Sequence, residues 1–225
     1  DMNDLSDPAI DVYDNAMFII ALDYLLEMAP DSPQASRWKS LREGIERNVR
    51  AHLWDEKRQK FIPHIYPEKS PIPEGFDELA IHYHGGTAIA IEAGLLSKDE
   101  IRTVNAQMLE NVRLSGMPSI GLTLYPVYPD GFFHGGMSKA YLYQNGGDWT
   151  WFGGRMIQQL VVNGMVEEAY AEIHPMIERV IQNDGFYEWY GKGGVPSGSG
   201  NFKGSAGVLS KAIELLRDWA EKNKS

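Results

Sequence analysis

Apolar side chains recur every three or four positions through the first part of the chain. From Asp14 onward this spacing predicts an amphipathic helix, and Pro30 is expected to end it because proline terminates helices nearby. A second helix is predicted over about 34–52, with Trp38 and Val49 on its apolar stripe. The short connection between the two predicts a helical hairpin.

The same period continues through the rest of the chain. We expect the third helix to be interrupted near Gly85-Gly86, and Ser97 to cap the fourth. Residues 53–66 predict a turn followed by an extended segment instead. We predict about seven helices in all. The helices after the first two span about 76–94, 98–113, 148–163, 165–183 and 203–222.

Long decorated loops separate the predicted hairpins. Residues 114–146 and 184–202 are rich in glycine and aromatic residues, and residues 1–10 read as a lead-in loop. Loops of this length in a compact domain are usually functional. We therefore predict a single all-α domain over 1–225 whose long loops gather at one rim, where sites tend to lie.

Composition narrows the choice of partners. The net charge of −10 without a basic patch argues against a nucleic acid partner, and the absence of cysteine excludes disulfides and thiolate metal sites. No apolar run is long enough for a membrane span, and no signal peptide is visible. The compartment stays open, with bacterial cytoplasm and periplasm both compatible. The opening Asp1-Met2 suggests a trimmed piece of a longer chain.

Glu188 is the first candidate for catalysis. It stands among four aromatic residues at 186–190, and partial desolvation there would raise its pKa toward that of a useful general base. The alternative is a surface glutamate that pairs or caps. Asp14 is a weaker candidate, because it is also placed to cap its helix.

The segment 143–151 carries candidates for binding. Asp148 precedes a predicted helix, where it would either cap the helix or hold a sugar hydroxyl. Trp149 and Trp151 are about 200° apart around a helix, so one is expected to pack inward while the other lines a pocket.

Histidines give little evidence for a metal site. His82 and His84 form an HxH pair, but no further ligand stands at a telling distance. His134, in the long loop, points either to substrate or to loop bracing. We expect no metal and no cofactor, since no nucleotide or phosphate motif is present.

Four segments resemble the six-hairpin glycosidases, especially trehalase, processing α-glucosidases and neutral invertase. The resemblance covers most of residues 11–216 in order, and implies an α/α toroid. The segments that carry it are Asp11 to Met17; Arg37 to Ile45 with Leu53-Trp54-Asp55-Glu56 and Phe61; Tyr143-Gln144-Asn145-Gly146-Gly147-Asp148-Trp149; and Tyr187-Glu188-Trp189-Tyr190 with Phe202 to Gly207.

This resemblance implies an inverting glycoside hydrolase with Glu188 as general base. The matching general acid lies before the segment that starts at Asp11, so it is expected outside this chain, in an N-terminal segment of the same enzyme. Only about seven of twelve helices are readable, which implies a partial toroid. Asp14 is the one acid candidate within the chain. The expected contacts to a carbohydrate substrate are Asn145, Asp148, Trp149, Trp151, Tyr187, Trp189 and His134.

Three alternatives stay open from the sequence. The segment Gly204-Ser205-Ala206-Gly207 resembles the disaccharide phosphorylases of the same superfamily, which use phosphate in place of an activated water. A non-catalytic carbohydrate-binding module would bind sugar without turnover. A helical-repeat interaction protein is the third alternative, although its repeats rarely carry loops this long.

Overall fold

The first two helices form the predicted hairpin. The computed structural model describes residues 8–224, so most of the predicted lead-in loop lies outside the described residues. Helix α1 spans Val12–Met28 and α2 spans Ala35–His52. Helix α1 begins before the predicted Asp14 because Asp11 is its N-cap, and the Asp11 side chain accepts a hydrogen bond of 2.8 Å from the Asp14 backbone N–H.

The extended segment after α2 forms a small hairpin. Strand β1 (Trp54–Asp55) pairs antiparallel with β2 (Lys60–Phe61). A 3₁₀ turn, η1 (Glu78–Ala80), then precedes helix α3 (His84–Glu92).

The predicted break at Gly85-Gly86 is wrong, because both glycines lie inside α3. The interruption falls just before them, where the backbone of His82 pairs with that of Tyr125. The glycines allow close packing: a Cβ on Gly86 would lie 2.8 Å from a methyl group of Val12.

The later helices follow the predicted ranges closely. Helix α4 (Lys98–Ser115) begins with the capping box of Ser97 and Glu100. Helix α6 (Val166–Asn183) continues through Pro175. The remaining helices are α5 (Thr150–Val162) and α7 (Lys203–Lys222).

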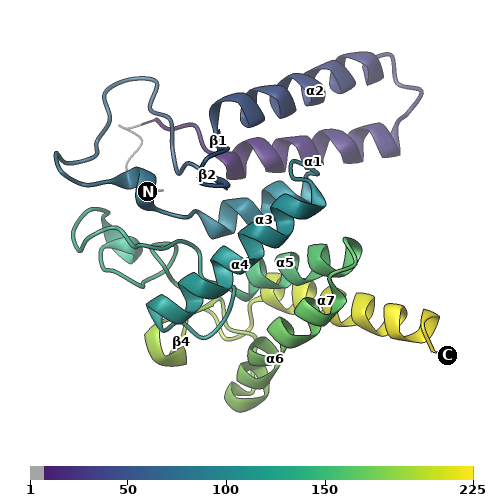
Figure 1. The fold of residues 1–225 in the computed structure, drawn as a ribbon. Coiled ribbons are helices and arrows are strands. Elements are labelled where there is room, and N and C mark those ends of the chain that lie inside the picture. Colours follow the sequence, from purple (N-terminus) through teal and green to yellow (C-terminus); the bar gives the residue numbers. More distant parts are fainter. Residues whose placement is uncertain (1–7, 225) are drawn as a thin grey trace.

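The helices form two layers (Figure 1). Helices α1, α3, α5 and α7 contact one another in that order and make the inner layer. Helix α2 packs on α1, α4 on α3, and α6 on both α5 and α7, so these three make the outer layer. The shared core contains Ile19, Ile89, Ile157 and Leu209, one from each inner helix and each at most 2% exposed.

The two long loops carry little regular structure. Residues 114–146 contain one 3₁₀ turn, η2 (Gly135–Met137). Residues 184–202 contain strands β3 (Trp189–Tyr190) and β4 (Pro196–Ser197), which pair antiparallel around a turn, η3 (Lys192–Gly194). Isolated bridges join Leu122 to Asp148 and Asp148 to Tyr190, so both loops are tied to the segment before α5.

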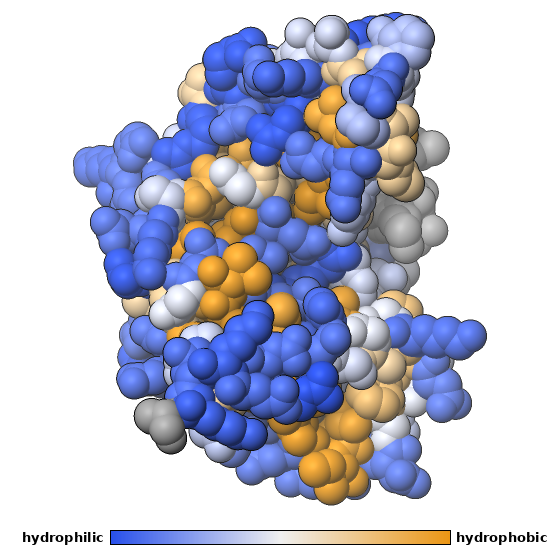
Figure 2. Space-filling view, turned by 90° about the vertical axis from the view of Figure 1, so that its right-hand side faces the viewer, coloured by the Kyte–Doolittle hydropathy of each residue, from blue (hydrophilic) through white to orange (hydrophobic). Residues whose placement is uncertain are grey.

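Apolar side chains break the polar surface at both ends of the inner layer. On α1, Phe18, Tyr24 and Met28 are exposed, and an apolar groove runs between α6 and α7 along Tyr170, Ile213 and other side chains. Figure 2 views the side of the molecule where α7 ends and shows apolar patches among polar residues. Among the described residues, no helix is long and apolar enough to cross a membrane.

Candidate functional site

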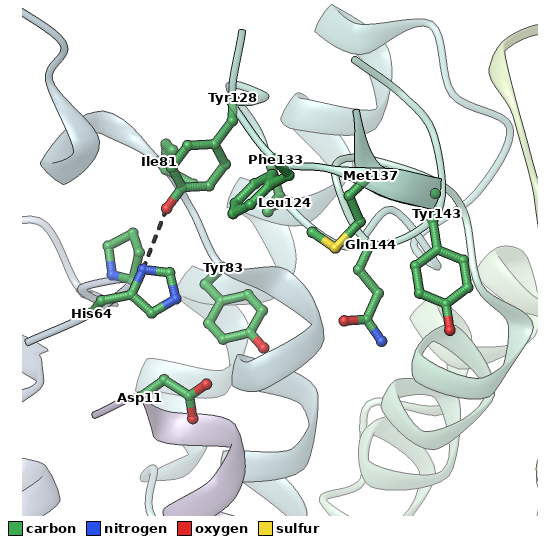
Figure 3. A pocket seen from close by; sticks show the side chains of 12 residues that line it. Asp11, His64, Ile81, Tyr83, Leu124, Tyr128, Phe133, Met137, Tyr143 and Gln144 are labelled. Carbon is green, nitrogen blue, oxygen red and sulfur yellow. Dashed lines mark hydrogen bonds between the residues drawn. The ribbon is translucent and has the colours of Figure 1, made fainter. Parts of the chain in front are cut away.

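A pocket of about 320 Å³ opens at the rim where the long loop meets the start of α1 (Figure 3). Its size suits a small-molecule site, since such pockets enclose about 300–1,000 Å³. Most of its wall is aromatic or aliphatic, with a few polar groups among them. The lining residues are Asp11, Pro63, His64, Ile81, Tyr83, Leu124, Tyr128, Phe133, Gly136, Met137, Tyr143 and Gln144.

Asp11 supplies a carboxyl group to this pocket. One of its oxygens accepts the Asp14 N–H and thereby caps α1. Burial raises the pKa of Asp11, although the hydrogen bond from Asp14 acts in the opposite direction. Burial also raises the pKa of Tyr83 well above its ordinary value, so this side chain keeps its hydroxyl proton. The pocket therefore offers both an acceptor and a hydroxyl to a ligand.

A buried carboxylate, that of Glu78, organises the wall that contains His64 and Tyr128. Glu78, which is 8% exposed, accepts hydrogen bonds from His64 Nδ1 at 2.8 Å, Tyr66 at 2.8 Å and Tyr128 at 2.6 Å, all at Oε1. Burial alone would raise the pKa of Glu78, but these hydrogen bonds together hold it below its ordinary value. Glu78 is therefore an anion that accepts from all three donors.

Asn145 fixes the long loop that covers the pocket. It is fully buried, and its Oδ1 accepts the Tyr128 backbone N–H at 2.9 Å while its Nδ2 donates to the Tyr128 carbonyl at 3.1 Å. This pair of bonds holds Tyr128 in the wall. Asn145 was expected to contact substrate, but it has no exposed surface and acts inside the loop instead.

Asp148 is likewise buried and does not cap α5. The N-cap of that helix is Trp149, without a side-chain cap bond. The Asp148 carboxylate instead accepts the Ser119 hydroxyl at 2.7–2.8 Å and pairs with Arg179 at 2.7 Å. Its own exposed fraction is 0%, so it presents no surface to a sugar. Its backbone pairs with Tyr190, and Asp148 thereby joins the two rim loops.

Glu188 lies in the second rim loop, beside the pocket wall. Its backbone N–H donates to the Ser199 carbonyl at 2.9 Å, and its Oε2 accepts the Ser199 N–H at 3.3 Å. Burial and the charge of Glu188 both raise the pKa of Tyr143, a residue that lines the pocket. The adjacent Trp189 meets the Tyr143 ring edge-on at 6.3 Å. Tyr143 thus connects Glu188 with the pocket.

The two tryptophans at the start of α5 have different surroundings, but neither of them lines the pocket. Trp149 is 5% exposed and its indole N–H donates to the Tyr143 carbonyl at 3.1 Å, so it packs inward. Trp151 is half-buried, lies under the Arg155 guanidinium at 4.3 Å, and does not line the pocket.

The other predicted site residues lie around the rim. Tyr187 is half-buried next to Tyr190, with ring centroids 6.1 Å apart. His134 is exposed immediately before η2, which contributes Gly136 and Met137 to the pocket. Asp14 is exposed on the first turn of α1 and does not line the pocket.

The pair of histidines considered as metal ligands lies at the start of α3, where His82 is half-buried and His84 is 4% exposed. The rings of His82 and His84 stack at 5.7 Å, and His84 Nε2 hydrogen-bonds Asn111 at 2.9 Å. Burial lowers the pKa of His82 to about 4 and that of His84 to about 3. Among the described residues, no group of three or more possible ligands could hold a metal ion.

Several pocket residues were not predicted from the sequence. Asp11 was passed over in favour of Asp14, although an aspartate directly before a helix is the usual cap. His64 and Tyr66 had a usable signal, because alternate residues of an extended segment face the same side. Nothing local to Glu78 or Tyr128 indicates that they meet, since they lie 50 residues apart.

Comparison with known proteins gives structural neighbours only: no family model and no curated protein matches the sequence. A GH63 mannosylglycerate hydrolase from Thermus thermophilus, solved with Tris and D-glycerate, is 18% identical and superposes with a TM-score of 0.63 over 93% of this chain and 46% of its own. An uncharacterised conserved protein from the same organism is 17% identical, with a TM-score of 0.64 over 96% of this chain and 48% of its own.

A protein described as a sialidase is more distant, at 12% identity and a TM-score of 0.60 over 83% of this chain and 17% of its own. At these identities the neighbours show the fold alone. The chain spans about half the length of the Thermus proteins. The predicted all-α, partial α/α toroid is confirmed: the chain has the fold of the α/α-toroid glycosidases.

Proposed function

We propose that this chain is the carbohydrate-binding part of an inverting glycoside hydrolase and that it carries the general base, Glu188. The observation behind this proposal is the position of Glu188. Its carboxylate accepts a hydrogen bond from the Ser199 N–H, and its charge raises the pKa of Tyr143, a residue of the pocket wall. A carboxylate beside a polar and aromatic pocket is the arrangement that activation of a water for attack on a sugar requires.

Inversion also requires a general acid, at about 6.5–9.5 Å from the base. We propose that it belongs to an N-terminal segment that completes the toroid. The partial coverage of the Thermus neighbours supports this proposal. The apolar groove between α6 and α7 and the exposed Phe18 and Met28 on α1 support it too, since further helices would cover both. Asp14 is the alternative acid within the chain.

We propose secondary sugar contacts around the rim. They are the half-buried rings of Tyr187, Trp189 and Trp151 and the exposed His134. Asn145, Asp148 and Trp149 support the same surface from inside, because each is at most 5% exposed. Aromatic faces suit the apolar faces of sugar rings, and the polar groups between them suit the sugar hydroxyls.

Glycosyl fluorides test the base separately from the acid, because fluoride leaves without needing a strong proton donor. We expect the chain to hydrolyse a glycosyl fluoride, and Glu188→Gln to lower kcat by about 10²–10⁴-fold. Asp14→Asn should leave this rate unchanged, and should lower hydrolysis of aryl glycosides only if Asp14 is the acid. The rates are measured with and without phosphate. A strict phosphate requirement, or hydrolysis that is equal in the parent and Glu188→Gln, would refute the proposal.

A further inference from the structure

We propose that the rim pocket binds an uncharged sugar unit through Nε2 of His64, with Glu78 as the positioning residue that fixes the proton on Nδ1. This inference rests on the proposed carbohydrate site. It does not depend on the catalytic role of Glu188, and it names the class of ligand that the pocket accepts.

The three hydrogen bonds to Glu78 determine the state of the His64 ring. Tyr66 and Tyr128 each reach Glu78 at hydrogen-bond distance, and their hydroxyls are donors to it. An ionised carboxylate only accepts hydrogen bonds, so the contact at 2.8 Å from His64 Nδ1 requires a proton on that nitrogen. In the neutral imidazole, Nε2 then carries the lone pair.

That second nitrogen faces the pocket. Figure 3 shows it on the side of the ring turned toward Tyr83 and Asp11, away from Tyr128. Within residues 8–224, Nε2 of His64 makes no hydrogen bond. One hydroxyl of a ligand in the pocket can donate to it, and a second hydroxyl can donate to Asp11.

The charges of the pocket select against acidic ligands. Asp11 lines it, Glu78 lies directly behind His64, and no lysine or arginine is among the described lining residues. An anion would meet two carboxyl groups without a cation to offset them. A neutral polyol instead offers hydroxyl donors to the acceptors, and its apolar face can pack on the half-buried rings of Tyr143 and Phe133.

This selection distinguishes two kinds of ligand seen in the structural neighbours. The Thermus hydrolase was solved with glucose and also with D-glycerate, an anion at neutral pH. The pocket of this chain has the chemistry to bind an uncharged sugar such as glucose.

Binding is measured on the Glu188→Gln protein, so that turnover does not interfere. Methyl glucoside, methyl mannoside and glucose are the neutral probes, and D-glycerate and glucuronate are the anionic probes, each titrated by calorimetry or tryptophan fluorescence. We expect saturable binding of at least one neutral probe and no binding of the anions over the same range. His64→Ala should weaken the neutral probe about tenfold, the effect of one lost hydrogen bond.

His52→Ala is the matched control. It makes the same substitution at an exposed histidine at the end of α2, outside the pocket, so the affinity should stay within about twofold. If His64→Ala unfolds, His64→Gln replaces it as the test variant. Unchanged affinity in a folded His64 variant, tighter binding of an anion, or no binding of any neutral probe would overturn the inference.

Nitrogen NMR of the His64 ring tests the role of Glu78. We expect a proton on Nδ1 in the parent, a mixture of tautomers in Glu78→Gln, and a shift of the Nε2 signal on addition of the neutral sugar. A parent with the proton on Nε2 would contradict the inference. The binding and NMR measurements do not depend on catalysis by Glu188. The sugar-binding proposal can therefore hold when the hydrolase proposal fails, and the hydrolase proposal can hold when the sugar-binding proposal fails.

Discussion

Buried charged side chains hold the rim loops to the helices. Arg179, 5% exposed on α6, pairs with Asp148, donates to the Thr150 hydroxyl at 2.6 Å, and lies 4.1 Å above the Tyr190 ring. This one side chain therefore joins α6, the start of α5 and the second rim loop. A charge removed from such a buried pair leaves its partner uncompensated, which is costly.

We predict that Arg179→Gln lowers the free energy of unfolding by about 3 kcal/mol. The control is Arg113→Gln, since Arg113 pairs with Glu110 on the exposed face of α4 and should cost less than about 0.5 kcal/mol. Urea unfolding of both variants measures the difference. Equal effects would show that the buried pair does not stabilise the rim.

The ionisation of Glu172 should make the stability of the fold depend on pH. Glu172 is 7% exposed on α6, its Oε1 accepts from Asn105 at 2.7 Å, and its Oε2 has no hydrogen-bond partner among the described residues. Burial raises its pKa to about 7 from the ordinary value of 4.5. The folded state therefore binds the proton more tightly than the unfolded state, and the contribution of Glu172 to stability is lost as the pH rises from 4.5 through 7.

Glu172→Gln should remove this loss. The neutral amide can accept from Asn105 and donate to Asn105 Oδ1, which is also buried and has no partner within residues 8–224. At pH 8 we expect the variant to be more stable than the parent by on the order of 2 kcal/mol, with little difference at about pH 4.5. Unfolding curves across this range measure it, and a gap that does not change with pH would contradict the assignment.

At the scale of elements, the helices were predictable and the loop contacts were not. Apolar periodicity located α2, α4, α6 and α7 because each buries one stripe and exposes the other face. Helix α3 is buried nearly all round, so its period is weak and the start of this helix was misplaced. For Asp148 the sequence suggested a helix cap or a sugar contact. Its burial was not predicted, because its partners Ser119 and Arg179 are 29 and 31 residues away, beyond any local pattern.

The turn that carries Gly198 positions Glu188. Gly198 has a φ of +69°, and a Cβ there would lie 2.7 Å from the Glu188 Cβ. We predict that Gly198→Ala displaces Glu188 and lowers activity on a glycosyl fluoride by at least about tenfold. Gly194→Ala is the matched control, since Gly194 has a φ of +74° in the same loop but nothing near its added methyl group.

Both variants share the backbone strain, about 1–3 kcal/mol for a non-glycine residue in this conformation. They should therefore lose similar stability, and only Gly198→Ala should lose activity beyond that. Equal activity in the two folded variants would show that activity does not depend on the position of Glu188.

At the scale of the whole molecule, the pocket is assembled from distant parts of the chain. Asp11 comes from the start of α1, His64 from the segment after β2, and Tyr128 and Tyr143 from the long loop before α5. The sequence located that loop and the rim, because glycine and aromatic residues gather there. It did not show which residues meet, because the inner layer α1, α3, α5 and α7 sets that arrangement.

The anomeric configuration of the first product tests the central claim most directly. Proton NMR during hydrolysis of a glycosyl fluoride identifies the anomer that forms before mutarotation mixes the two. We predict the inverted anomer from the parent and a rate lower by about 10²–10⁴-fold in Glu188→Gln. A retained anomer, or an inverted one formed equally fast by Glu188→Gln, would contradict a Glu188-activated water as the nucleophile.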